Sequence, residues 1–128
     1  MPSDRSFILI ILIALLAASL TGCGHWKPDR WDALELGMAG ALVVSTAIDY
    51  GQTSKIARNS DQYVELNPIL GRHPSQDLIN VYFPVGLAVE LGIAHILPHP
   101  WRKSWLGLTL GGEITCVIHN HSQVGLDP

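Results

Sequence analysis

The chain begins with a long apolar run, which constrains the fold more than any other feature of the sequence. Residues 7–20 are apolar apart from Ser19, follow a short polar start that carries Arg5, and give way to Thr21 and Gly22. A run of this length with such flanks fits the core of a secretory signal peptide better than a stable membrane span. We therefore expect a signal helix at 1–22 whose removal leaves 106 of the 128 residues, enough for one small domain.

The apolar run ends in the four residues Leu20-Thr21-Gly22-Cys23. This box, at this place behind such a run, resembles the cleavage site of bacterial lipoproteins. The resemblance covers only the leader and implies a covalent, palmitate-containing lipid on Cys23. It also implies a place in the bacterial cell envelope, with Cys23 on the periplasmic side of the inner or the outer membrane. An uncleaved signal anchor in which Cys23 occurs by chance is the alternative.

Composition narrows the possible functions. The net charge is −3 and the pI is about 6.0, with no basic stripe, so binding to nucleic acid is disfavoured. Charged residues make up only 15% of the chain and the mean hydropathy is +0.26, because the part after the leader is itself hydrophobic. Once Cys23 carries lipid, Cys116 has no partner for a disulfide.

The sequence predicts an all-α fold, a small bundle of three hydrophobic helices after the N-terminal signal helix. A polar tether at 23–31 precedes a helical membrane domain at 32–120, and a tail follows at 121–128. The three helices are expected at about 32–54, 75–97 and 101–120, because these stretches are apolar on most faces and are separated by polar or proline-rich segments. Helices of this kind lie in lipid or inside a bundle.

The first predicted helix carries a polar stripe on an otherwise apolar surface. The stripe should face protein rather than lipid, because its members follow the i, i+3, i+4 spacing of one helix face. Its members are Ser45, Thr46, Asp49, Gln52 and Thr53.

Helix length alone does not decide whether the helices are embedded in a membrane or form a soluble bundle. The helices approach the 20 or so residues of a membrane crossing, but their uninterrupted apolar cores are closer to about 12–15 residues. We expect the helices to be embedded, since a soluble bundle of this size needs more polar surface. Three crossings would then leave the C-terminus in the cytoplasm. A soluble periplasmic bundle, tethered only by the lipid, is the alternative.

Each predicted helix carries an ionisable residue within or beside its apolar stretch. A charge in hydrocarbon costs a few kcal/mol, so such residues should turn inward and pair, or hold a proton or an ion. The alternative is that they only fix the packing of the helices. No catalytic residue and no particular metal is assigned. The candidate polar cluster is Asp49, Gln52, Thr53, Glu65, Asn67, Glu90, His95, Glu113, His119 and Asn120.

The end of the first predicted helix and the loop after it together form a recognisable sequence pattern. Asp49 and Thr53 lie at the end of the first predicted helix, and Glu65, Asn67 and Pro68 lie in the following loop. The pattern Asp-x-x-x-Thr … Glu-x-Asn-Pro resembles small uncharacterised bacterial membrane proteins. The resemblance covers about residues 47–71 and implies a helical membrane fold without an assigned activity. This chain differs by its lipoprotein leader.

These observations favour a protein that is not an enzyme. We expect a lipid-anchored helical membrane protein that serves as a structural or interaction module, with membrane lipid and another envelope protein or a second copy as partners. No cofactor beyond the lipid is expected, although the acids and histidines could hold a metal. The main alternative is a membrane-embedded metal- or proton-binding site, transport-like or hydrolytic.

Overall fold

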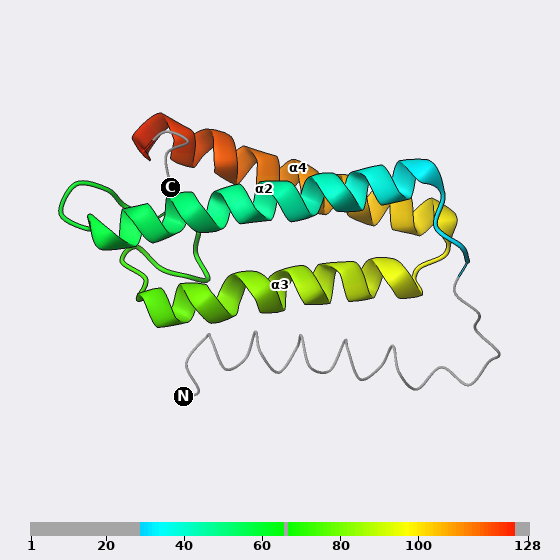
Figure 1. Ribbon diagram of the computed structural model, residues 1–128, viewed down its shortest axis with the longest axis horizontal. Helices are drawn as coiled ribbons and strands as arrows, with labels where there is room; N and C mark the ends of the chain where they lie inside the picture. The colour runs from blue at the N-terminus through cyan, green and yellow to red at the C-terminus, as the bar shows by residue number, and fades with distance from the viewer. Residues whose placement is uncertain (1–28, 66, 125–128) are drawn as a thin grey trace.

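The computed structural model describes residues 29–65 and 67–124. The predicted signal peptide, the lipidation site at Cys23 and most of the predicted tether lie outside this part. The described residues form α-helices and connecting loops with no strand, which confirms the predicted all-α bundle (Figure 1). The helices are α2 (Ala33–Arg58), α3 (Gln76–Ile96) and α4 (His99–Val124).

Helix α2 begins with a capping box. The side chain of Asp32 accepts a hydrogen bond from the N–H of Glu35 (2.8 Å), and the Glu35 carboxylate accepts one from the N–H of Asp32 (2.9 Å). This exchange satisfies two N–H groups that the start of a helix leaves without intrahelical partners. At the other end, Lys55 and Arg58 lie in the last turn, where positive charge complements the helix dipole.

The connection between α2 and α3 is held by its own backbone hydrogen bonds. The N–H of Gly71 donates to the carbonyl of Asn67 (2.9 Å), and Gly71 has a φ of 78°, a conformation that glycine adopts without strain. The N–H of Glu65 donates to the carbonyl of Arg72 (3.1 Å), which joins the two sides of the loop. The loop also buries an apolar side chain against α3, in a cluster formed by Leu70, Ile79 and Phe83.

Helices α3 and α4 are joined by a short turn. The side chain of Ser75 caps the start of α3 by accepting a hydrogen bond from the N–H of Leu78 (3.3 Å). The N–H of Arg102 donates to the carbonyl of Pro98 (2.8 Å) at the start of α4. Pro100 lies in the first turn, where its missing N–H removes no helical hydrogen bond.

Two helices are longer than the sequence predicts. α2 ends four residues beyond its predicted end, and α4 begins two residues earlier and ends four residues later than predicted. Residues 121–124 of the predicted tail are therefore helical. Polar side chains that suggested loops instead make contacts across the bundle: Lys55 Nζ donates to the carbonyl of Val124 (3.1 Å). α3 agrees with its predicted range to within one residue at each end.

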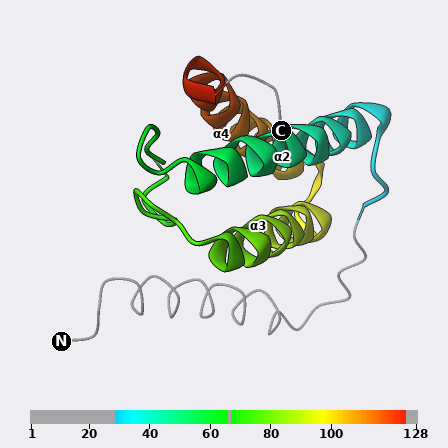
Figure 2. The same cartoon turned by 60° about the vertical axis from the view of Figure 1, so that its left-hand side comes forward.

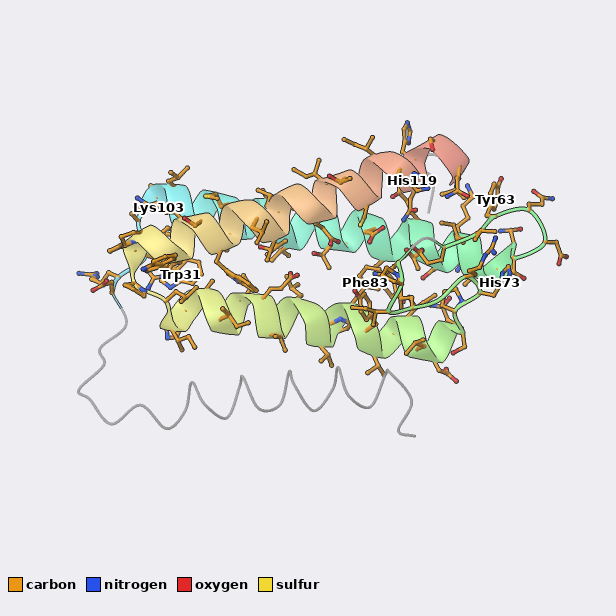
Figure 3. The ribbon with its side chains drawn as sticks, turned by 180° about the vertical axis from the view of Figure 1, so that it is seen from behind. Trp31, Tyr63, His73, Phe83, Lys103 and His119 are labelled. Carbon is orange, nitrogen blue, oxygen red and sulfur yellow. The ribbon has the colours of Figure 1, made fainter. Side chains whose placement is uncertain are left out.

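Helices α2 and α4 run parallel, and α3 runs antiparallel to both. Glu35 in the first turn of α2 contacts His99 at the start of α4, and Lys55 near the end of α2 contacts the end of α4. In Figures 1 and 2, α4 crosses α2, so that it starts near the end of α3 and diverges from α3 afterwards. Figure 3 labels one end of the bundle by Trp31 and Lys103, and the other by Tyr63, His73 and His119.

The distribution of polar and apolar side chains is inverted relative to a water-soluble bundle. Seven of the nine buried residues of α2 are polar or charged. The buried apolar cluster between the three helices contains only Leu42, Ala94 and Leu106, with partly buried side chains around it. The outer faces carry large apolar side chains, as shown by the exposed fractions of Leu108 (72%) and Ile118 (66%).

Helices α2 and α3 are long and apolar enough to cross a membrane, judged by length and composition. Only 28% of the most apolar window of α2 and 17% of that of α3 is buried inside the structure. The core helix of a soluble protein is mostly buried, whereas most of the apolar window of α2 and of α3 is not. α4 has the same length as α2, 26 residues, and packs alongside it.

Candidate functional site

The first polar group lies where α2 and α4 start, and we call it the terminal ion-pair network. Its centre is Glu35, whose side chain has no exposed surface. Oε2 of Glu35 accepts a hydrogen bond from Nη1 of Arg102 (3.1 Å), and Oε1 accepts one from Nδ1 of His99 (2.8 Å). Arg102 is also fully buried, so this ion pair is shielded from water. The network is Asp32, Glu35, His99, Arg102 and Lys103.

Arg102 links all three helices at this end. Its Nε donates to the carbonyl of Ala94 near the end of α3 (2.8 Å), while its Nη1 reaches Glu35 on α2. Its Nη2 makes no hydrogen bond, but the ring of Trp31 covers the guanidinium, with Cζ 5.1 Å from the ring centroid. A cation over an indole face is stabilised by the ring electrons.

Asp32 forms the outer edge of the network. Its Oδ2 lies 2.6 Å from Nζ of Lys103, and both side chains are about 40% exposed. The hydrogen bond from Lys103 is the largest cause that holds the pKa of Asp32 below its ordinary value, followed by the bond from the N–H of Glu35. Asp32 therefore stays ionised in mildly acidic solution, and its stabilising contribution is lost only as the pH falls through that lowered pKa.

Asp32, Glu35 and His99 bring possible metal ligands within 4.8 Å of one another. All four carboxylate oxygens are already engaged, however. Those of Asp32 accept from Lys103 and from the N–H of Glu35, and those of Glu35 accept from His99, Arg102 and the N–H of Asp32. A metal would have to displace a buried guanidinium, so this group is better suited to joining helices than to holding an ion.

The second polar group lies at the other end of the bundle, and we call it the loop-anchoring network. The hydroxyl of Thr53 donates to Oε2 of Glu65 (3.0 Å), whose Oε1 accepts from the N–H of Asn67 (2.8 Å). Nδ2 of Asn67 donates to the hydroxyl of Tyr82 on α3 (2.9 Å), and Oδ1 accepts from the N–H of Ile69 (3.0 Å). The network of Thr53, Glu65, Asn67 and Tyr82 therefore joins α2, the loop and α3.

The third polar feature lies between these two networks, and we call it the interior acids, Asp49 and Glu113. Oδ1 of Asp49 on α2 accepts a hydrogen bond from Nδ2 of Asn120 on α4 (2.7 Å), and both residues are buried. Glu113 on α4 lies within electrostatic range of Asp49 and of Glu90 on α3. The interior acids therefore come from neighbouring helices and interact electrostatically.

Six of the ten members of the predicted polar cluster lie in the last two groups or bond to them: Thr53, Glu65 and Asn67 in the loop-anchoring network, and Asp49, Glu113 and Asn120 at the interior acids. None of the ten belongs to the terminal ion-pair network, and the two histidines lie elsewhere. His95 lies at the opposite end from the loop, where its Nδ1 accepts from Nε1 of Trp31 (3.4 Å), because α3 runs antiparallel to α2. His119 is exposed and contacts Gln123 one turn further along α4 (3.3 Å). Neither histidine reaches the interior acids. That histidines complete a site with these acids stays a prediction.

The remaining members of the predicted cluster lie on the inner side of their helices. Gln52 is 2% exposed and belongs to the polar stripe of α2, all five members of which are buried. Glu90 is half-buried, and its backbone carbonyl accepts a hydrogen bond from Nε1 of Trp105 (2.9 Å), which joins α3 to α4.

The terminal ion-pair network was not predicted from the sequence. One local signal was present: Asp32 and Glu35 have the spacing of a capping box at the start of a helix. The partners of Glu35, His99 and Arg102, lie more than 60 residues further along the chain. No local pattern indicates that Arg102 is buried beside Glu35.

The described residues offer no arrangement of a nucleophile with a base. Cys116 is half-buried on α4, and the charged groups within its electrostatic range are acidic: Asp49, Glu65 and Glu113. His119 lies three residues further on but contacts Gln123 instead. The arrangement can hold helices together and can accept a positive charge in the interior.

No protein-family model matches the chain, and neither a curated protein nor a solved structure matches it.

Proposed function

We propose that this chain is a lipid-anchored helical membrane protein of the bacterial cell envelope that acts as a structural or interaction module. The inverted distribution of side chains carries the proposal. Glu35, Asp49 and Glu65 are at most 5% exposed, while large apolar side chains cover the outside of all three helices. In water this arrangement would expose apolar surface and desolvate acids at once, and both changes are unfavourable.

A bilayer makes the same arrangement favourable. Apolar outer faces then contact lipid chains, and the polar groups are satisfied by one another inside the bundle. Three hydrogen bonds between different elements satisfy polar groups in this way. They join Arg102 to Glu35, Asn120 to Asp49, and Thr53 to Glu65.

The two ends of the bundle suit the two membrane interfaces. Trp31 and Lys103 lie at one end (Figure 3), and the first turn of α4 adds Trp101, which is 68% exposed; such aromatic side chains favour the interface. The polar loop at 59–75 lies at the other end. The 26 residues of α2 are about 39 Å long at 1.5 Å per residue, enough for a hydrocarbon core of about 30 Å.

The resemblance of the leader to lipoproteins supports an anchor at the Trp31 end. The described chain begins at residue 29, six residues after Cys23, and leads directly into α2. A lipid on Cys23 would therefore insert into the membrane leaflet nearest to Trp31, which we assign to the periplasmic side. The choice between inner and outer membrane is left to experiment.

An outer groove between α2 and α4 supports the interaction role. It is lined by small and branched apolar side chains, among them Gly40, Ala41, Val44, Ile48 and Ile114. A Cβ atom added at Gly40 would meet nothing within 4 Å, so the packing of this chain does not require glycine there. Small residues let a helix of another envelope protein, or of a second copy, approach closely in a membrane.

Carbonate extraction tests the embedding. The variant Cys23→Ala is made with an ordinary signal-peptidase site in place of residues 20–22, so that the leader is still removed but no lipid is added. We expect this variant to stay in the membrane pellet, as the lipidated protein does. Its release into the supernatant would support a soluble bundle tethered only by lipid and would refute the embedded fold.

Labelling with palmitate tests the anchor separately. The unaltered chain should incorporate labelled palmitate, and Cys23→Ala should not. Globomycin, which blocks lipoprotein signal peptidase, should cause a longer precursor to accumulate. Absence of label from the unaltered chain would remove the lipid anchor and the assignment of Cys23 to the periplasmic side, while leaving the extraction result to decide the embedding.

A further inference from the structure

Trp31 joins the segment before α2 to the other two helices. It is partly buried at one end of the bundle (Figure 3) and packs against the apolar cluster between the three helices. Its ring covers the guanidinium of Arg102 on α4. Its Nε1 donates a hydrogen bond to Nδ1 of His95 on α3, with 3.4 Å between the two nitrogens. The terminal ion-pair network is therefore covered by a residue that also bonds to α3.

The hydrogen bond between Trp31 and His95 requires a neutral histidine. The indole nitrogen of tryptophan is only a donor, so Nδ1 of His95 must accept with its lone pair. A protonated imidazole carries a hydrogen on both nitrogens and cannot accept this bond. His95 is exposed, so protons from the solvent reach it. The bond therefore exists only while His95 is neutral.

The acids of the terminal ion-pair network are already paired with other cations. Glu35 of α2 bonds to Arg102 and His99 of α4. Asp32, at the start of α2, bonds to Lys103 of α4. Arg102 contacts the same indole ring that bonds to His95, so a second positive charge there is repelled by the first. Protonation of His95 therefore opposes the contacts of Trp31.

The other charged groups on the segments around His95 do not favour one protonation state. Asp29 and Arg30, which precede Trp31, are both exposed and carry opposite charges. Glu90 lies five residues before His95 on α3, and this spacing places the two side chains on different sides of the helix. The bond from Trp31 is thus the specific contact that a proton on His95 breaks.

Arg102 provides a separate reason for Trp31 to move. Nη2 of this buried guanidinium makes no hydrogen bond while the ring of Trp31 covers the group. A buried donor without an acceptor is unfavourable. If the ring moves away, water reaches Nη2 and supplies the missing bond. The covered arrangement therefore carries a cost that the open arrangement lacks, and the bond to His95 acts against this opening.

We propose that Trp31 and His95 form a pH-sensitive closure over the terminal ion-pair network, closed while His95 is neutral and opened by its protonation. If Cys23 carries lipid on the periplasmic side, this closure lies at the periplasmic interface. The acidity of that compartment would then control how firmly the lipid-bearing segment is held against the bundle. Only this placement rests on the function proposed above, since the closure itself depends on contacts within the chain.

Nuclear magnetic resonance of the indole N–H groups tests the closure. Full-length processed protein with isotope-labelled tryptophan is titrated in detergent from about pH 8 to about pH 5, the range in which histidine changes charge. The signal of Trp31 is identified by its absence from Trp31→Phe, and it should shift with the uptake of one proton. The indole of Trp105 is the internal control, because it donates to the backbone carbonyl of Glu90, which does not titrate.

Variants of the histidines assign the response. His95→Gln keeps an acceptor that cannot be protonated, so the signal of Trp31 should no longer change with pH. His95→Phe removes the acceptor and should give the acid position of the signal throughout the titration. His99→Gln and His73→Gln are the controls, since His99 contacts Glu35 and His73 is exposed in the loop. Both controls should keep the response.

Exchange of the indole proton of Trp31 with water measures the opening. At the acid end of the titration, the unaltered chain should exchange about two- to tenfold faster than His95→Gln at the same pH, which corresponds to the loss of one hydrogen bond. Equal exchange rates, or a signal of Trp31 that does not change with pH, would overturn the closure. A response that persists in His95→Gln and is lost in His99→Gln would assign the proton to His99 instead. None of these measurements depends on lipid or on membrane extraction, so the proposed function is tested separately.

Discussion

At the scale of single residues, the ion pair between Glu35 and Arg102 decides how the ends of α2 and α4 meet. Both side chains are fully buried, so removing one leaves the other charge without compensation. We expect Glu35→Ala or Arg102→Met to lower the free energy of unfolding by about 3–5 kcal/mol. Unfolding of the purified protein in detergent by increasing amounts of SDS measures the change.

The double variant separates the value of the pair from the penalty of an unpaired charge. Glu35→Met combined with Arg102→Met removes both charges and should recover most of the lost stability, since apolar replacements of buried ion pairs are often neutral. Lys103→Met is the control: its pair with Asp32 is exposed, so the loss should stay below about 1 kcal/mol. A double variant as unstable as the worse single one would contradict this account.

The hydrogen bond between Thr53 and Glu65 gives the second prediction at this scale. Thr53→Val keeps the shape of the side chain but leaves Oε2 of the buried Glu65 carboxylate without its donor, at a loss of about 1–3 kcal/mol. Thr53→Ser retains the hydroxyl and should stay close to the unaltered protein. Because Glu65 also holds Asn67, the loop should open more often in Thr53→Val. Faster proteolytic cleavage within 59–75 would report this opening, and an unchanged rate would argue against it.

At the scale of elements, the outer face of α2 carries glycines that the packing of the bundle does not use. Gly40 is exposed within a regular helix, and an added Cβ would meet nothing within 4 Å. Gly40→Ala should therefore stabilise the isolated protein by about 0.5–1 kcal/mol through helix propensity. SDS unfolding at low protein concentration is the measurement. Destabilisation that disappears on dilution would indicate that another helix already packs against Gly40.

Features that lie within a single helix or loop could be predicted from the sequence. The polar stripe of α2 was predictable because five polar residues at helical spacing define one face, whatever lies opposite. The involvement of Glu65 and Asn67 was also predictable, because Pro68 and Gly71 constrain the loop that carries them. Local periodicity was enough in these cases, since each feature lies within one helix or one loop.

Features that depend on the register between helices could not be predicted. Glu35 is a single acid in an apolar stretch, and its partner Arg102 lies 67 residues further on. His95 lies on the same helix as Glu90, and the antiparallel course of α3 places it at the end of the bundle where α2 begins. The contact between His95 and Trp31 depends on the register of α3 against α2. Side-chain packing between the helices determines this register, and no short segment of the sequence encodes it.

At the scale of the whole molecule, the directions of the helices predict where the chain ends. α2 and α4 are parallel, and Lys55 near the end of α2 bonds to the carbonyl of Val124 at the end of α4. If all three helices cross the membrane and Cys23 is periplasmic, the loop at 59–75 and the C-terminus both lie in the cytoplasm. A green fluorescent protein fused after Pro128 should therefore fluoresce, because it matures in the cytoplasm.

Fusions to alkaline phosphatase, which is active only outside the cytoplasm, complete the prediction. Phosphatase fused after Pro128 should be inactive, and phosphatase fused after Pro98, in the turn between α3 and α4, should be active. An active fusion at both positions, with no fluorescence at Pro128, would mean that α4 does not cross. Since α4 contributes Arg102 and Asn120 to the bonds that hold α2, it would then have to leave the membrane together with α2. The embedded bundle and the orientation would be refuted together.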